Sequence, residues 1–378
     1  MGKKYMIPEG MRDLILGECL TKKKLQKDIE EVLDKWGYTE IITPTIEYYQ
    51  TINSGFQNLK EEEVYKFFDA KGRILVLRPD MTVPIARVVA TKFKEIDRPI
   101  RFRYCADVFR LHKSFGGRKN EYTDCGIELI GLNSEESDLE ILTTALETLE
   151  VLGDTKFKLE IGNIDFFNSA IKDLNLDDEK KEKLASLIDK KSLKALEDYL
   201  EDLNISAEYK KFLNELPLLF GGIEVIEKAK KYAFNDELKN SLGYLEGICL
   251  NLKELGYDDI ITFDLAMVPR LNYYTGIIFR GFVDGVGATV LSGGRYDKLI
   301  STFGRDYPAV GFSINLDTLL SVLEIETNSS NVRSIIYYGK DKKIEALKKA
   351  KKLREEGNIV ELIPDKETSK LEIKKDVK

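Results

Sequence analysis

Charged side chains suited to holding a small polar ligand flank a loop between two apolar segments in residues 101–131. Arg110 ends the first segment, Arg118 lies in the glycine-containing loop, and Glu128 interrupts the apolar end of the second segment. The alternation of side chains predicts a β-hairpin. A carboxylate inside an apolar strand favours a pocket for an anionic or zwitterionic ligand. A surface hairpin whose charges face water fits this stretch equally well, so both alternatives stay open here.

A second polar cluster, Arg78-Pro79-Asp80-Met81-Thr82, separates a predicted strand at 74–77 from a helical pattern at 83–93. Thr82 fits the N-cap position of that helix, and Pro84 fits an early helical position. Asp80 complements the positive end of the helix dipole. Local sequence therefore favours a capping role for Asp80 over ligand binding.

Two later loops carry aromatic residues that have two interpretations. Tyr273 and Tyr274 precede a predicted strand at 277–282, where they either belong to the core with satisfied hydroxyl groups or form the wall of a small-molecule pocket. The segment Ser292-Gly293-Gly294-Arg295-Tyr296-Asp297 ends another strand in a predicted glycine turn. Its glycines indicate close approach of neighbouring backbone.

The elements that position these residues alternate between helices and strands. The helical spacing at 19–36 ends at Gly37, and Pro44 interrupts the strand that follows. The pattern of residues 165–255 predicts a helical insertion. A polar linker at 328–331 precedes a small β-α-β unit at 334–363. We also predict a hairpin at 65–68 and 74–77, helices at 138–152 and 316–323, and strands at 157–161, 260–265, 290–297 and 308–314.

Composition excludes several classes of protein. The chain has 378 residues, 43% of them hydrophobic, and a formal net charge of −7, which gives no general support to nucleic-acid binding. No apolar run is long enough to span a membrane and the start lacks a signal-peptide pattern, so we expect a cytoplasmic protein. Four cysteines without CxxC spacing predict buried free thiols. His112 is the one histidine, and we expect no metal and no cofactor.

In order, these segments resemble the class II aminoacyl-tRNA synthetase catalytic fold, and specifically histidyl-tRNA synthetase. The helix 19–36 with Pro44 is similar to the first class II motif, which builds the dimer interface. Residues 101–131 resemble the second motif and residues 308–323 the third, while 78–82, 271–276 and 292–297 resemble the histidine-pocket segments. The resemblance implies an α+β protein with an antiparallel six-stranded sheet flanked by helices, contained in residues 1–327.

The residues that would activate an amino acid depart from this pattern. His112 occupies the position at which the synthetase has a glutamate that binds the adenine of ATP. Thr318 occupies the position of an arginine that binds the ATP phosphates. A neutral hydroxyl group cannot replace that charge-assisted contact. Pro269 occupies the position of the catalytic arginine, with Arg270 one residue later. Residues 332–378 resemble only part of an anticodon-binding domain.

The positions that bind histidine in the synthetase are retained in this sequence. The resemblance implies that Asp80, Thr82 and Asp124 take the α-ammonium group, since carboxylates suit an ammonium ion. Glu128 and Tyr273, with Tyr274, would take the imidazole, because a buried carboxylate accepts an imidazole N–H. Arg110 and Arg118 would remain as a residual phosphate or anion site.

A retained pocket without the activating residues resembles the histidyl-tRNA synthetase-like regulatory subunit of ATP phosphoribosyltransferase. That resemblance implies a non-catalytic subunit that joins the short catalytic subunit in the first step of histidine biosynthesis. It also implies inhibition by histidine, a homodimer formed through residues 19–50, and no tRNA partner. A divergent histidyl-tRNA synthetase, or a histidine-sensing paralogue with another partner, are the alternatives.

Overall fold

The computed structural model describes residues 6–56, 59–93, 95, 97–112, 119–268, 274–325, 333–365 and 371–376. Contacts divide the chain into two units. One contains Met1–Asp13 and Lys22–Leu323, and the other contains Leu14–Thr21 and Glu324–Lys378. The two units are described separately below.

A nine-stranded sheet organises the larger unit, in the order β1-β5-β6-β12-β11-β10-β7-β9-β8. Its six central strands pair antiparallel throughout, which confirms the expected six-stranded sheet. They are β5 (Ile100–Phe109), β6 (Glu121–Ile130), β12 (Ala309–Asn315), β11 (Leu291–Arg295), β10 (Ile277–Val283) and β7 (Phe157–Asn163). Three strands extend this core. They are β1 (Thr39–Glu40), parallel to β5; β9 (Ile261–Asp264), parallel to β7; and β8 (Phe220–Gly221) at one edge.

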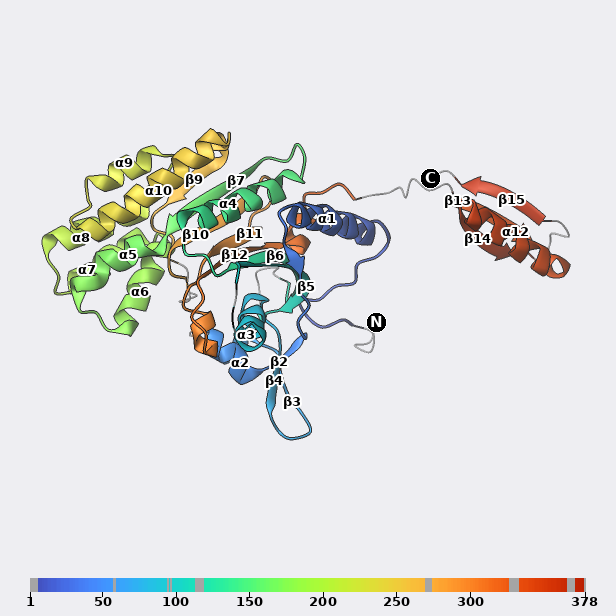
Figure 1. The fold of residues 1–378 in the computed structure, drawn as a ribbon, viewed down its shortest axis with the longest axis horizontal. Helices are drawn as coiled ribbons and strands as arrows, with labels where there is room; N and C mark the ends of the chain where they lie inside the picture. Colours follow the sequence, from blue (N-terminus) through green and yellow to red (C-terminus); the bar gives the residue numbers. More distant parts are fainter. Residues whose placement is uncertain are drawn as a thin grey trace. The chain divides into compact units, whose positions relative to one another are not determined.

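One face of the sheet is covered by α1 (Leu16–Lys35) and α4 (Glu135–Glu150), as Figure 1 shows. Alternate residues of β6 point to this face, because side chains along a strand alternate between the two faces of a sheet. Ile127 and Leu129 are fully buried there, in one core with Ile29 and Leu33 of α1. The remaining β6 side chains therefore point to the opposite face.

The opposite face packs against α3 (Thr82–Lys92), with α2 (Tyr49–Gly55) beside it and a smaller three-stranded sheet. That sheet contains β2 (Ile46–Tyr48), β4 (Ile74–Leu77) and β3 (Lys66–Phe68) in this order. Both strands of the predicted hairpin are thus confirmed. Val83, Ile85 and Val89 of α3 have no exposed surface and form a second apolar core with Tyr104 of β5.

The predicted helical insertion is confirmed, with one exception. Among its helices, α10 (Asp236–Glu254) packs on β7 and on α4, and α5 (Ile164–Ile171) packs on β10 (Figure 1). The exception is the two-residue strand β8, whose length is too short to give a sequence pattern. The other helices are α6 (Asp178–Asp189), α7 (Leu193–Asp202), α8 (Ala207–Glu215) and α9 (Glu224–Lys230).

The second unit contains a three-stranded sheet in the order β14-β13-β15, with α12 (Lys343–Glu355) packed on it. The parallel pair β13 (Arg333–Tyr338) and β14 (Ile359–Pro364) is the expected β-α-β unit. The description as a β-α-β fragment is incomplete, because β15 (Leu371–Asp376) adds an antiparallel third strand to β13. The charged composition of 371–376 concealed this strand.

Three local predictions need correction. The N-cap of α3 is Met81 and Thr82 is the first helical residue, so Thr82 does not cap the helix. Gly293 and Gly294 lie within β11 and not in a turn after it, although their backbone does approach neighbouring atoms closely. The helix expected at 316–323 is only α11 (Leu316–Leu319).

The prediction of free thiols is wrong for two of the four cysteines. Cys105 and Cys125 form a disulfide bond between β5 and β6, whereas Cys19 and Cys249 are free. The two bonded residues are directly opposite each other in the strand register, with their Cα atoms 4.0 Å apart. Spacing along the sequence could not reveal this pairing, because it follows from the register of the hairpin.

Within the described ranges, no helix combines the length and the apolar character that a membrane crossing requires.

Replacing Ile127 by alanine will destabilise the larger unit. Ile127 is 0% exposed between the sheet and its covering helices, so the change leaves a cavity as well as removing buried apolar surface. We expect a loss of about 2–4 kcal/mol in the free energy of unfolding, measured by denaturant titration. Leu250→Ala is the control, since Leu250 of α10 is 54% exposed. Equal stability of the two variants would contradict the assignment of this face to the core.

Candidate functional site

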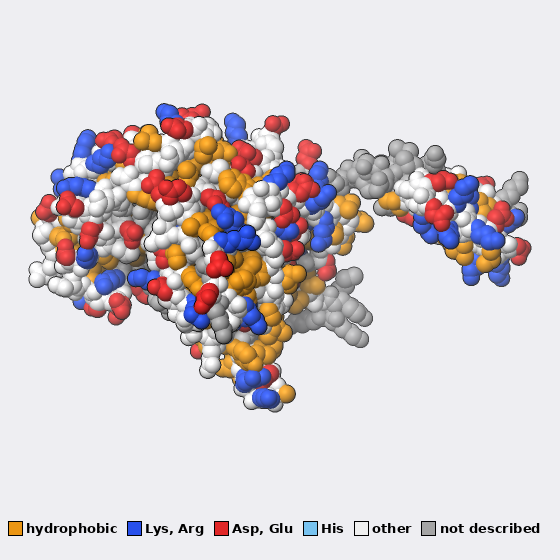
Figure 2. All heavy atoms as spheres, in the orientation of Figure 1, with side chains coloured by type: hydrophobic (Ala, Val, Ile, Leu, Met, Phe, Trp, Pro, Cys, Tyr) orange, Lys and Arg blue, Asp and Glu red, His pale blue; other side chains and the backbone are white. Residues whose placement is uncertain are grey.

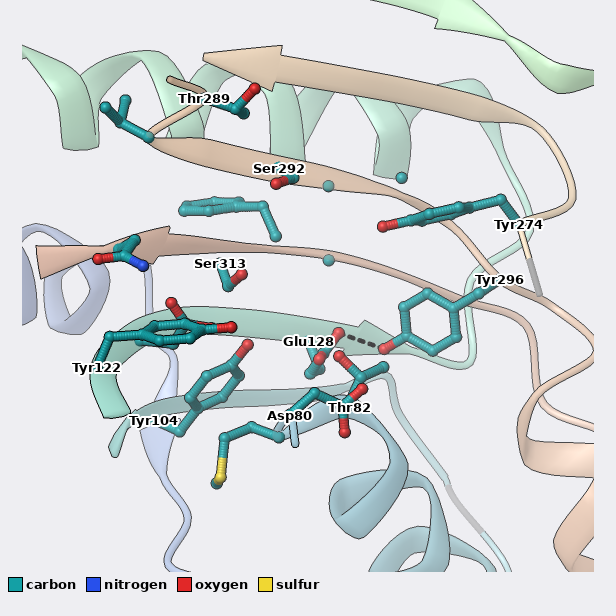
Figure 3. A pocket seen from close by; sticks show the side chains of 18 of the residues that line it. Asp80, Thr82, Tyr104, Tyr122, Glu128, Tyr274, Thr289, Ser292, Tyr296 and Ser313 are labelled. Carbon is teal, nitrogen blue, oxygen red and sulfur yellow. Dashed lines mark hydrogen bonds between the residues drawn. The ribbon is translucent and has the colours of Figure 1, made fainter. Parts of the chain in front are cut away.

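A polar cavity lies between the central sheet and the start of α3, with a volume of about 210 Å³. Figure 3 shows its side chains converging from β5, β6, β11 and β12 and from the segment before α3. The volume is several times the ~30 Å³ that one water molecule occupies in the liquid, so a small organic ligand can enter. The cavity lies on the face of the sheet opposite α1 and α4.

Strand β6 supplies two acids to the cavity. Asp124 and Glu128 lie four residues apart and therefore on the same face of the strand, away from the buried side chains of Ile127 and Leu129. Gly311 lies directly opposite Glu128 on β12. A Cβ atom at this glycine would clash with the Glu128 carboxylate and with the Ile127 carbonyl, so only glycine leaves room for the acid.

Glu128 is 1% exposed and accepts a hydrogen bond from the Tyr296 hydroxyl group. Burial raises the pKa of Glu128 to about 8, while the hydroxyl groups of Tyr296 and Thr82 act in the opposite direction and Asp80 adds to the rise. Figure 3 shows Glu128 beside Thr82 and Tyr296. Below pH 8 this carboxyl group is therefore mainly neutral in the ligand-free chain.

Asp80 is the second buried acid and has one oxygen atom without a partner. Its Oδ1 atom accepts a 3.4 Å hydrogen bond from the Val83 amide, while its Oδ2 atom is buried and makes no hydrogen bond. Burial raises its pKa to about 7 although the Arg110 charge lowers it. The capping role that local sequence favours is thus present, but it uses only one of the two oxygens. An unpaired buried acceptor costs stability unless a ligand satisfies it.

The pKa of Asp124 is shifted by the same surroundings as that of Asp80. Burial raises its pKa to about 7, Arg110 lowers it, and the carboxylates of Asp80 and Asp317 raise it further. Among the described residues that line the cavity, Arg110 is the one cation. Its Nε atom donates a 2.9 Å hydrogen bond to the Pro79 carbonyl group. The cavity therefore carries three acids and one base, which suits a ligand with a cationic group.

The remaining walls are neutral. Tyr104, Tyr122 and Tyr274 line the cavity, and Tyr296 closes it beside Glu128 (Figure 3). Hydroxyl and amide groups line the other end, at Thr289, Ser292, Ser313 and Asn315. The sequence singled out Tyr274 and placed Ser292 and Tyr296 in the 292–297 segment, which resembles part of a histidine pocket. It assigned no role to the other wall residues.

A buried ion cluster fixes the segment that carries Tyr296. Arg295 is 5% exposed, and its Nη2 atom donates a 2.6 Å hydrogen bond to Asp138 and a 2.7 Å bond to the Ser137 hydroxyl group. Asp138 in turn accepts a 2.6 Å hydrogen bond from Tyr244 of α10. Gly294, the preceding residue, packs against Tyr274, because a Cβ atom there would meet the Tyr274 ring at 2.8 Å. The cavity wall is thus tied to α4 and to the helical insertion.

The cavity brings together most of the residues that the sequence singled out: Asp80, Thr82, Arg110, Asp124, Glu128 and Tyr274. The alternative of a solvent-facing hairpin is therefore wrong for Glu128. Two predicted site residues, Tyr273 and Arg118, lie outside the described residues, as do Pro269 and Arg270. Across the described ranges no group of three or more His, Cys, Asp or Glu side chains is arranged to hold a metal ion.

Comparisons with known proteins agree with this architecture. A family model described as histidyl-tRNA synthetase matches residues 10–319. The histidyl-tRNA synthetase from Nostoc sp. PCC 7120 has a similar fold, with a TM-score of 0.79, 23% identity, and coverage of 98% of this chain and 88% of that one. The fold and the sequence match define a protein of the histidyl-tRNA synthetase type, with the class II aminoacyl-tRNA synthetase fold.

The more similar relatives carry a more specific name. The ATP phosphoribosyltransferase regulatory subunit of Caldanaerobacter subterraneus subsp. tengcongensis is 40% identical over 371 residues, covering 97% of each chain. A crystal structure described as an ATP phosphoribosyltransferase regulatory subunit/histidyl-tRNA synthetase from Bacillus halodurans C gives a TM-score of 0.85 at 32% identity, covering 96% of this chain and 94% of that one. This chain belongs to the family of ATP phosphoribosyltransferase regulatory subunits.

Replacing Asp80 by asparagine will change how stability depends on pH. The folded-state pKa of Asp80 is raised to about 7, so the ligand-free chain loses stability as pH rises and this buried group ionises. The Asp80→Asn variant lacks that loss. We expect its unfolding free energy relative to the wild type to increase by about 2–3 kcal/mol between pH 5 and pH 9. Denaturant titrations at both pH values measure this, and a constant difference would contradict the buried, unpaired state of Asp80.

Proposed function

We propose that this chain is a non-catalytic subunit required by a short ATP phosphoribosyltransferase catalytic subunit, and that it mediates feedback inhibition by histidine. The reaction served would be the first step of histidine biosynthesis. The observation that carries the proposal is a cavity lined by three acids, in a chain of the regulatory-subunit family. Two of these acids, Asp80 and Glu128, are buried, and Asp80 has an unpartnered oxygen. Such a cavity is a site for a small cationic or zwitterionic ligand.

Histidine has the groups that this cavity can satisfy. Its α-ammonium group matches Asp80 and Asp124, because an opposite charge favours the ionised form of both acids and supplies the missing hydrogen-bond donor. Its imidazole ring can donate an N–H to Glu128, which the Tyr296 hydroxyl group already orients. Tyr274 lies beside that position and offers an aromatic wall (Figure 3).

The proposed absence of aminoacylation rests on the nucleotide-binding positions. Thr318 lies in the first turn of α11, where its amide donates to the Asn315 side chain, and its neutral side chain offers no charge to a phosphate. His112 lies at the end of the described part of the hairpin loop, with its amide bonded to Asn120. With these substitutions, ATP would lose one contact to its base and one to its phosphates, so no activated amino acid would form for transfer to tRNA.

Regulation follows from linkage between the two binding events. Histidine inhibits the complex only if it binds the inhibited arrangement more tightly than the active arrangement. A tenfold ratio of these affinities corresponds to about 1.4 kcal/mol of coupling free energy. Loss of a group that binds histidine would thus remove inhibition without removing the partner's activity.

We also propose a homodimer formed through residues 19–50. This range contains large apolar side chains that the chain leaves exposed: Leu20, Ile42, Ile46 and Tyr48. Phe68 and Ile74 of the neighbouring small sheet are exposed as well, and Figure 2 shows hydrophobic side chains gathered over that part of the larger unit. Contiguous exposed apolar surface is typical of a protein interface.

The regulatory function can be tested by mixing the purified chain with the short catalytic subunit from the same organism. We expect the chain to raise the rate of phosphoribosyl-ATP formation and histidine to suppress it. Glu128→Ala should raise the inhibitory histidine concentration at least about tenfold, because it removes the acceptor for the imidazole. Glu160→Ala is the control, since Glu160 belongs to β7 of the same sheet and does not line the cavity.

An unchanged rate, with no co-elution of the two proteins, would rule out the regulatory assignment. Histidine-dependent exchange of ATP and pyrophosphate would then identify a divergent synthetase. Histidine binding without either activity would identify a sensor that has another partner.

The dimer is tested by sedimentation at micromolar concentration. Ile42→Glu should raise the dimer dissociation constant at least about tenfold, because a charge would be buried at the interface. Leu250→Glu is the control, at an exposed leucine of α10 outside residues 19–50. A wild-type monomer, or equal effects of the two substitutions, would refute this interface.

A further inference from the structure

We propose that Tyr244 of α10, in the helical insertion, is a positioning residue for the ligand cavity: through a buried ion pair it fixes Tyr296, which orients Glu128. The ion pair joins Asp138 and Arg295. This inference rests on the proposed function, in which Glu128 binds the imidazole of histidine. No described lining residue of the cavity belongs to the helical insertion, so the insertion acts on the ligand only through other residues.

Tyr244 satisfies one oxygen atom of Asp138. Its hydroxyl group donates a 2.6 Å hydrogen bond to the Asp138 Oδ2 atom, while the Oδ1 atom accepts bonds of 2.9 Å and 2.6 Å from Nε and Nη2 of Arg295. Asp138 is 4% exposed, so water does not readily replace the tyrosine. Replacing Tyr244 by phenylalanine therefore leaves a buried carboxylate oxygen without a donor.

The charge of Asp138 depends on the same hydrogen bond. Burial raises the pKa of Asp138, whereas the hydrogen bonds and charge of Arg295 and the hydrogen bond from Tyr244 lower it. Without the Tyr244 hydroxyl group, the neutral form of Asp138 becomes more favourable. A neutral Asp138 no longer makes charge-assisted hydrogen bonds of full strength to Arg295, so the buried pair weakens.

Arg295 holds Tyr296 from both sides in the chain. Its Nη1 atom donates a 3.0 Å hydrogen bond to the Asp297 Oδ1 atom, which also accepts a 3.0 Å bond from the Ala309 amide. The Tyr296 amide donates a 2.7 Å bond to the Ala309 carbonyl group. These bonds close a ring that ties residues 295–297 to β12. A displaced Arg295 side chain releases Asp297 and thereby shifts the backbone at Tyr296.

Tyr296 connects this cluster to the cavity. It is 3% exposed, and its hydroxyl group donates a hydrogen bond to Glu128, which a dashed line marks in Figure 3. This bond also lowers the pKa of Glu128, against the larger rise caused by burial. If Tyr296 moves, Glu128 loses both its fixed direction and part of its negative charge, and it becomes a weaker acceptor for an imidazole N–H.

The test measures histidine binding to the full chain by titration calorimetry. Tyr244→Phe should raise the dissociation constant about 5- to 20-fold, the order of effect of one hydrogen bond to a charged group. Tyr38→Phe is the matched control, because the Tyr38 hydroxyl group donates a 2.9 Å bond to Glu140 of the same helix α4, and Tyr38 does not line the cavity. This control should change the dissociation constant less than about twofold.

A double-mutant cycle separates positioning from a general loss of stability. Tyr296→Phe removes the hydroxyl group that Tyr244 positions, and it should itself weaken histidine binding. In the Tyr296→Phe background, Tyr244→Phe should weaken binding less than about twofold further. A merely structural role for Tyr244 would give effects that multiply, because lost packing does not depend on the hydroxyl group of Tyr296.

Wild-type affinity of Tyr244→Phe, an equal effect of Tyr38→Phe, or effects that multiply in the double variant would each refute the positioning role; the proposed histidine site would stand. A wild type that binds no histidine would overturn that site and this inference together. If Tyr244→Phe does not fold, as judged by its thermal transition, Ser137→Ala replaces it, because it removes the 2.7 Å bond from Arg295 to the Ser137 hydroxyl group. It should weaken histidine binding at least about threefold, and an unchanged affinity would overturn the inference.

Discussion

The enclosure of three carboxyl groups in one cavity is the constraint on which the site depends; Asp80 and Glu128 are buried and Asp124 is half-buried. A carboxyl group withdrawn from water is costly unless it is hydrogen-bonded, paired or neutral. Glu128 has the Tyr296 hydroxyl group, Asp80 and Asp124 have the nearby charge of Arg110, and burial raises the pKa of all three. One Asp80 oxygen nevertheless remains without a partner. The cavity is thus built for a ligand that brings a positive group.

The scaffold holds this cavity through contacts that continue well beyond it. Arg295 is bonded to Asp138 of α4, and Asp138 is bonded to Tyr244 in the helical insertion. Tyr296, the next residue after Arg295, orients Glu128. A ligand that contacts Tyr296 would therefore lie one residue from a buried cluster that joins the sheet, α4 and α10.

Membership of the regulatory-subunit family and the composition of the cavity address different parts of the function. The family relationship links the chain to a phosphoribosyltransferase complex, and it does not say which residues bind a ligand. The cavity supplies that chemistry, since its acids, its arginine and its tyrosines are the groups that recognise a zwitterion with an aromatic side chain.

The sequence by itself determined the hairpins and the helical insertion, because side-chain alternation and turn residues are local properties. It pointed to the candidate site residues only through resemblance to a known family. It could not determine that Cys105 lies opposite Cys125, or that Gly311 makes room for Glu128, since both depend on strand register. Strand β15 was missed because its charged residues carry no apolar alternation. Only the tertiary structure decided that Asp80, Arg110 and Glu128 share one cavity, because packing α3 against the sheet brings them together across 48 positions of sequence.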